Sequence, residues 1–132
     1  MQITRQADYA IRAVRYLSHQ GANQRTSTRD VADAMKIPPS FLAKIVSQLS
    51  IAGLLHTSRG ARGGVSLARD PKEITLLDVV EAIDGPILLN ECVGNPADCV
   101  FNGECPVHPI WVDTQQELVA RLRKTNFASL AK

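Results

Sequence analysis

Apolar side chains recur every three or four positions in several stretches of the chain, a spacing that predicts amphipathic helices. The first predicted helix covers residues 6–19 and stops near Gly21, and the second covers 28–35, with Ser27 or Thr28 as its N-cap. A third helix is expected from the second of two adjacent prolines up to Gly53, because proline can begin a helix but cannot continue one. The short, tight connection between the second and third helices is typical of a helix-turn-helix.

The segment GLLHTSRGARGGVSLARD that follows predicts two short strands, at residues 54–58 and 65–68. They are joined by the segment RGARGG, whose glycines permit the positive backbone dihedrals of a hairpin tip. A basic hairpin that directly follows a helix-turn-helix is a wing. We therefore predict a mainly α fold with a small β-hairpin wing, that is, a winged helix-turn-helix.

The second half of the chain is predicted to hold two helices separated by a loop. Thr75 is expected to cap a helix that Gly85 and Pro86 terminate, and the last helix is expected to begin at Pro109 and run to residue 125. An apolar stripe that includes Ile110, Trp111, Leu118 and Leu122 lies along this long helix. Because a small domain offers little core to cover such a stripe, we expect a C-terminal dimerisation helix, with intramolecular packing as the alternative.

A chain of 132 residues is most simply one compact domain. Charge nevertheless divides it in two: residues 1–70 carry a net charge of +6, from ten basic and four acidic side chains, and residues 71–132 carry −4, from five and nine. We interpret 1–70 as a winged helix-turn-helix region that meets a polyanion, and 71–132 as a cluster-binding loop with a dimerisation helix. The candidate contacts with double-stranded DNA are Thr28, Ser40, Lys44, Ser47, Arg59, Gly60, Arg62, Gly63 and Gly64.

All three cysteines lie in the loop before the last helix. Six residues separate Cys92 from Cys99, five separate Cys99 from Cys105, and His108 follows after two more. Zinc sites usually contain close C-x-x-C pairs, which are absent here, whereas wider spacing in an irregular loop suits an iron–sulfur cluster bound by soft thiolates. The fourth ligand is then His108 or a carboxylate from elsewhere, for which Asp8 is the candidate.

The segments ADYAIR and SRGARGG, together with the three-cysteine loop, resemble the Rrf2 family of bacterial transcription regulators over nearly the whole chain. The resemblance implies a dimeric protein in which Cys92, Cys99 and Cys105 hold an iron–sulfur cluster. In the IscR branch a histidine placed like His108 completes a 2Fe-2S cluster, and in the NsrR branch an aspartate of the partner subunit, placed like Asp8, completes a 4Fe-4S cluster. This sequence carries both residues, so cluster type stays open.

The resulting hypothesis is a dimeric transcription regulator whose binding to operator DNA is controlled by the cluster, with cluster supply, iron, nitric oxide or redox state as the signal. The main alternative is a cluster-free regulator that uses thiol redox chemistry or binds zinc. We expect no enzymatic activity and no small-molecule substrate, because no arrangement of nucleophile and base is visible. Without an apolar run of about 20 residues or a signal peptide, the protein is expected in the cytoplasm, away from the membrane.

Overall fold

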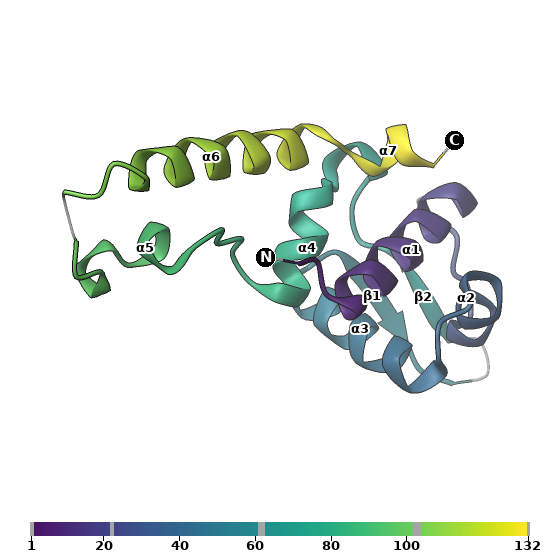
Figure 1. Cartoon of the computed structure of the whole chain (residues 1–132). Helices are drawn as coiled ribbons and strands as arrows, with labels where there is room; N and C mark the ends of the chain where they lie inside the picture. The colour runs from purple at the N-terminus through teal and green to yellow at the C-terminus, as the bar shows by residue number, and fades with distance from the viewer. Residues whose placement is uncertain (1, 22, 61–62, 102–103, 132) are drawn as a thin grey trace.

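The computed structural model describes residues 2–21, 23–60, 63–101 and 104–131, and Figure 1 shows the whole chain. In the described residues the elements follow one another as α1 (Arg5–Gln20), α2 (Thr28–Met35), α3 (Pro39–Ile51), β1 (Leu55–Ser58), β2 (Gly64–Leu67), η1 (Pro71–Glu73), α4 (Leu76–Asp84), α5 (Glu91–Gly94), η2 (Pro96–Asp98), α6 (His108–Lys124) and α7 (Phe127–Leu130). The prediction of a mainly α fold with one small hairpin is confirmed.

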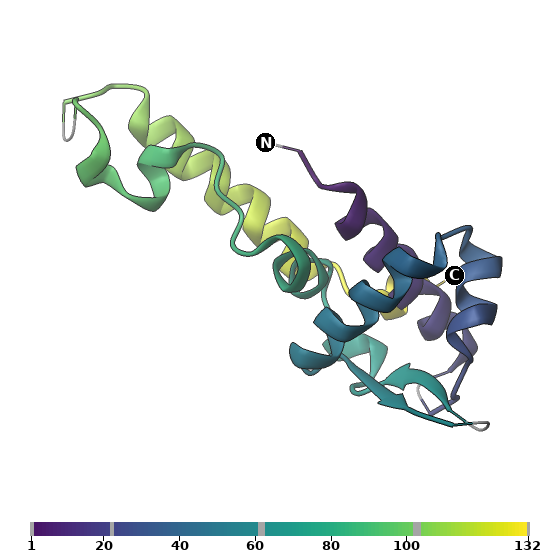
Figure 2. The same ribbon diagram turned by 90° about the horizontal axis from the view of Figure 1, so that it is seen from below.

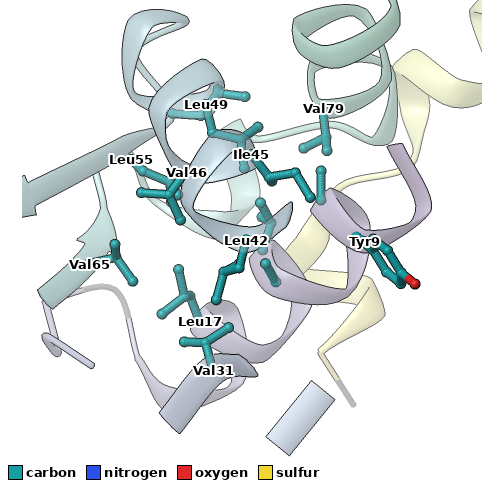
Figure 3. Close-up of a cluster of buried hydrophobic side chains, with 14 of the residues drawn as sticks. Tyr9, Leu17, Val31, Leu42, Ile45, Val46, Leu49, Leu55, Val65 and Val79 are labelled. Atoms are coloured by element: carbon teal, nitrogen blue, oxygen red, sulfur yellow. The ribbon is translucent and has the colours of Figure 1, made fainter. Parts of the chain in front are cut away.

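Helices α1 to α4 and the hairpin enclose one hydrophobic core, which we call the core of the body. The predicted helical spacing directs apolar side chains of all four helices into this core, and the buried strand residues Val65 and Leu67 close one side. Figure 3 shows how these side chains converge between the helices, with the Tyr9 ring at the edge of the cluster. The largest fully buried side chains are Phe127, Leu17, Leu42, Ile45, Leu49, Leu54, Ile74, Val14, Val31 and Val79.

Side chains and prolines at the helix starts explain where the helices begin. The side-chain oxygen of Ser27 accepts a hydrogen bond from the backbone N–H of Asp30, so Ser27 is the N-cap and Thr28 is the first residue of α2. Pro39 occupies the first turn of α3. Thr75 and Asp78 form a reciprocal capping box at the start of α4. The predicted caps are thus confirmed, with Ser27 as the one that caps α2.

The wing, of which the structure describes residues 55–60 and 63–67, is an antiparallel hairpin in which Leu55 pairs with Leu67 and Ser58 with Gly64. A third segment joins it, because Thr26 forms a bridge with Val65. The predicted strands were one residue too long at one end of each, since Leu54 and Ala68 lie outside β1 and β2. Backbone pairing therefore ties the wing to the start of α2.

A long arm extends from the body, and we define it as the described residues 88–101 and 104–117, which include α5, η2 and the first ten residues of α6. Figures 1 and 2 show it projecting away from α1 to α4 in both views. The remainder of α6 packs on the body, where Leu118, Val119 and Leu122 contact a small second cluster of Leu77, Val80 and Ile87. The C-terminal part of α6 is thus anchored on the body, whereas in its N-terminal part Gln115 Oε1 accepts a hydrogen bond from the backbone N–H of Leu89 at 2.9 Å, within the arm.

The segment after α6 returns to the body, which the sequence did not predict. Leu76 donates a backbone hydrogen bond to the carbonyl oxygen of Thr125 at 2.8 Å, and the ring of Phe127 is fully buried. In α1, Arg15 Nε donates to the carbonyl oxygen of Leu130 at 3.1 Å. The last described residues are therefore part of the structure of the body.

The segment that carries the cysteines is more regular than predicted. The cysteine loop, expected to be irregular, contains the helical turns α5 and η2 because Asn90 caps the first and Pro96 begins the second.

Within the described ranges, no helix has the length and apolar character needed to cross a membrane.

Candidate DNA interface and cysteine arm

Helix α3 presents a polar face to solvent. Ser40, Lys44 and Ser47 are exposed and follow one another at intervals of four and three residues, which places them on one side of the helix. The opposite side, with Leu42 and Ile45, is buried in the core of the body. An amphipathic second helix with small polar and basic side chains outward can lie in a major groove with its first turns nearest the base edges.

Helix α1 supports the first turn of α3 through an aromatic and cationic contact. The rings of Tyr9 and Phe41 lie 6.0 Å apart between centroids, at an angle of 54°. The guanidinium of Arg12 lies 5.3 Å from the centre of the Tyr9 ring, and Arg12 Nη2 pairs with Asp8 Oδ2 at 2.9 Å. Through these contacts α1 supports the orientation of α3, whose polar face points toward solvent.

The wing residues have two different roles in the structure. Arg59 and Gly60 are exposed at the tip, where Gly60 adopts a φ of 98°; the predicted contact Arg62 lies outside the described residues. A Cβ on Gly63 would lie 2.4 Å from the carbonyl oxygen of Ser58, and one on Gly64 would lie 2.5 Å from that of Thr26. Gly63 and Gly64 thus permit close backbone approach within the wing itself, a role the sequence did not indicate.

One basic residue near the wing was missed from the sequence. Arg25 precedes the residue that pairs with Val65, and a Cβ on Gly64 would lie 3.1 Å from Arg25 Cγ. Its side chain is exposed. No local motif marks Arg25, because its position depends on a bridge between residues 39 positions apart in the chain.

The cysteines are distributed along the arm. Cys92 lies in α5, Cys99 directly follows η2, and Cys105 precedes α6; all three are free and half-buried. His108 is the first residue of α6, and its backbone N–H donates to the carbonyl oxygen of Cys105 at 3.3 Å. Cys105 and His108 are therefore held one helical turn apart.

The donor chemistry of the arm fits an iron–sulfur cluster, since three thiols and an imidazole are the ligands that such clusters take. The conformation of the arm does not bring these ligands together. Among the described residues, no three Cys, His, Asp or Glu side chains are close enough to one another to hold a metal ion. Asp8 lies on the body, in the first turn of α1, with its carboxylate paired to Arg12.

The predicted apolar stripe of the last helix divides into two parts. Leu118 and Leu122 pack against α4, so for this part the alternative of intramolecular packing is correct. Ile110 and Trp111 are 58% and 38% exposed, and Val107 before them is 46% exposed. These residues form an uncovered apolar surface on the arm.

Comparison with known proteins decides the family. Residues 3–132 match the model of the Rrf2 family, which is described as an iron-dependent transcriptional regulator. The chain belongs to the Rrf2 family. Its resemblance to that family, seen first in the ADYAIR and SRGARGG segments, is confirmed, and it is a transcription regulator. A family of regulators agrees with the expectation that the chain is not an enzyme.

Relatives and solved structures support the same assignment. The HTH-type transcriptional regulator NsrR of Shouchella clausii is 34% identical over 106 residues, which cover 80% of this chain and 71% of NsrR. The structure of CymR, the global cysteine regulator of B. subtilis, aligns with a TM-score of 0.83 at 26% identity, covering 99% of this chain and 96% of CymR. IscR of T. potens aligns with a TM-score of 0.77 at 19% identity over 98% of this chain and 85% of IscR, a similarity that shows the fold. The predicted winged helix-turn-helix is thus confirmed.

Proposed function

We propose that this Rrf2 regulator binds operator DNA as a homodimer, and that an iron–sulfur cluster on the arm controls the affinity. One observation carries the proposal: the helix that follows the cysteines, α6, packs directly on the body that presents α3 and the wing. The chain thereby joins a segment of three free thiols to a candidate DNA interface through a single helix.

DNA binding is supported by the arrangement of α3 and the wing. Lys44 on the exposed face of α3 can donate to a guanine or a phosphate, and Ser40 and Ser47 can donate or accept on either side of it. Arg59 at the wing tip suits a phosphate or the adjacent minor groove. Thr28 at the start of α2 is exposed beside them, so its hydroxyl can contact the backbone.

Dimerisation is supported by the apolar surface of the arm. Val107, Ile110 and Trp111 are large, apolar and exposed on the arm. A second copy would cover them in a two-fold interface, and it would also place two copies of α3 on successive half-sites of a palindromic operator.

Cys92, Cys99 and Cys105 would hold the cluster as thiolates, with His108 or the partner subunit's Asp8 as the fourth ligand. His108 has the advantage that it is already one turn from Cys105. Asp8 would have to exchange its ion pair with Arg12 for the new ligand. When bound, the cluster would supply sensitivity to oxidants, nitric oxide or iron supply, and it would require the arm to gather thiols that lie apart here.

A change in the arm reaches α3 through packed side chains. Leu118 and Leu122 contact Leu77 and Val80 on α4, and Val79 on the same helix belongs to the core of the body with Ile45 of α3. Ile11 of α1 packs against both clusters. Two conformations of the arm would therefore differ in how α4 and α1 pack against α3. Control of DNA affinity by the cluster needs two such states of the protein.

The test is to purify the protein without oxygen, record its visible absorption, and measure its affinity for a duplex operator obtained by in vitro selection. Cys99→Ala is expected to abolish the absorption and change operator affinity or choice. Gln116→Ala, a substitution at an exposed position on the side of α6 opposite Ile110 and Trp111, should change neither. Unchanged colour and binding in Cys99→Ala would refute cluster control.

A second candidate is a cluster-free regulator whose cysteines react directly or bind zinc. The three free, half-buried thiols are the groups that such a regulator would use, and a protein of similar fold is described as a global cysteine regulator. Colourless anaerobic protein with stoichiometric zinc, or with operator binding that follows thiol oxidation, would support this candidate over the first.

A further inference from the structure

We infer that Arg25 binds the phosphate backbone of DNA from the base of the wing, in addition to the contacts made by the hairpin tip. The inference rests on the proposed DNA binding and adds a residue that belongs to neither the helix-turn-helix nor the hairpin motif. It is argued from strand pairing, side-chain direction and charge.

Strand pairing brings Arg25 to the wing. Thr26 donates a backbone hydrogen bond to the carbonyl oxygen of Val65 at 2.9 Å, and Val65 donates to that of Thr26 at 2.8 Å. This reciprocal pair is the hydrogen-bonded geometry of antiparallel strands. The segment before α2 therefore pairs with the free edge of β2 through one antiparallel bridge, and Figure 2 shows it at the same end of the molecule as the hairpin.

Alternation along the strand directs Arg25 outward. Val65 is 2% exposed and faces the core of the body, so its neighbour Ser66 faces the other way and pairs with the exposed His56. By the same register Arg25 lies next to Ser66 on this outward face. Its Cγ lies over Gly64, where a Cβ would approach to 3.1 Å, so the absence of a side chain at Gly64 makes room for the arginine stem.

The charge of this surface suits an anion. The described residues of the three wing segments, 23–27, 55–60 and 63–67, contain no aspartate or glutamate, and their permanently charged side chains are Arg25 and Arg59. Thr28, at the start of α2, follows Arg25 by three residues. Arg25 thus lies between two elements proposed to touch DNA. A planar guanidinium with several donors matches phosphate oxygens better than other side chains do.

The experiment measures how binding to the selected operator and to a random duplex falls with KCl, by fluorescence anisotropy. For Arg25→Gln we expect the slope of log affinity against log salt to shrink by about 1.8, because the homodimer loses two phosphate contacts and each contributes about 0.9. Affinity should fall about 100-fold on both duplexes, roughly tenfold for the charge-assisted hydrogen bond lost from each protomer. Arg25→Lys should retain the slope, and the control Arg121→Gln, an exposed residue of α6, should match the wild type.

Several outcomes separate this inference from the proposed function. Wild-type protein that shows no salt-dependent binding to duplex would overturn DNA binding itself. Wild-type binding with an unchanged slope in Arg25→Gln would overturn only the role of Arg25. A lower melting temperature in Arg25→Gln that Arg25→Lys shares, without a change in slope, would show a structural role and would also count against the inference.

Discussion

The backbone N–H of Phe127 donates to the carbonyl oxygen of Ile74 at 3.0 Å, and both side chains are fully buried. This contact joins the end of the chain to the segment between the wing and α4. Phe127→Ala is expected to lower the free energy of unfolding by about 3–5 kcal/mol, because a large buried ring leaves a cavity. Chemical denaturation measures the effect. Phe101→Ala, at a ring 65% exposed on the arm, is the matched control and should change stability by no more than about 0.5 kcal/mol.

Gly64 is expected to be intolerant of any side chain. In Gly64→Ala the new methyl group would lie 2.5 Å from the carbonyl oxygen of Thr26, so the bridge between Thr26 and Val65 must open or shift. We expect a loss of about 1–3 kcal/mol in urea denaturation, the usual cost of overpacking. Ser66→Ala, two residues further along the same strand, should have little effect. Equal stability of Gly64→Ala and wild type would contradict the close approach of Thr26 to the wing.

The apolar surface of the arm is expected to mediate dimerisation. Ile110→Asp should raise the dimer dissociation constant at least about 30-fold in sedimentation velocity, because a charge would be buried at the centre of the interface. Ile51→Asp is the matched control: Ile51 is the last residue of α3, is 85% exposed and is not part of the arm, so its replacement should leave the dimer intact. Similar dissociation constants for Ile110→Asp and wild type would place the interface elsewhere.

The fourth ligand can be identified by two substitutions in protein purified without oxygen. If His108 is the ligand, only His108→Ala should change the absorption and Mössbauer spectra, in favour of a 2Fe-2S cluster. If it is Asp8, only Asp8→Ala should do so, in favour of a 4Fe-4S cluster. Loss of the exposed Asp8–Arg12 ion pair should cost at most about 1 kcal/mol, so Asp8→Ala protein should fold and its spectrum can be interpreted.

The body of the fold was largely predictable because its determinants are local. The apolar period of α1 to α4, the cap at Thr75 and the proline at the start of α3 each act within one or two helical turns, so they can be recognised in the sequence alone. The same holds for the hairpin, whose glycines mark the turn. The helix α7 escaped prediction because four residues carry no periodicity, and Phe127 is helical only in contact with the core of the body.

For the candidate sites, the sequence determined which chemistry is present: three thiols, a histidine and an aspartate as ligand candidates, and a basic first half. Tertiary structure decided where these groups lie. It placed Asp8 on the body beside Arg12 and the cysteines on the arm, divided the apolar stripe of α6 between packed and uncovered parts, and brought Arg25 to the wing. These relationships depend on contacts between residues far apart in the chain, which residue types and their spacing do not specify.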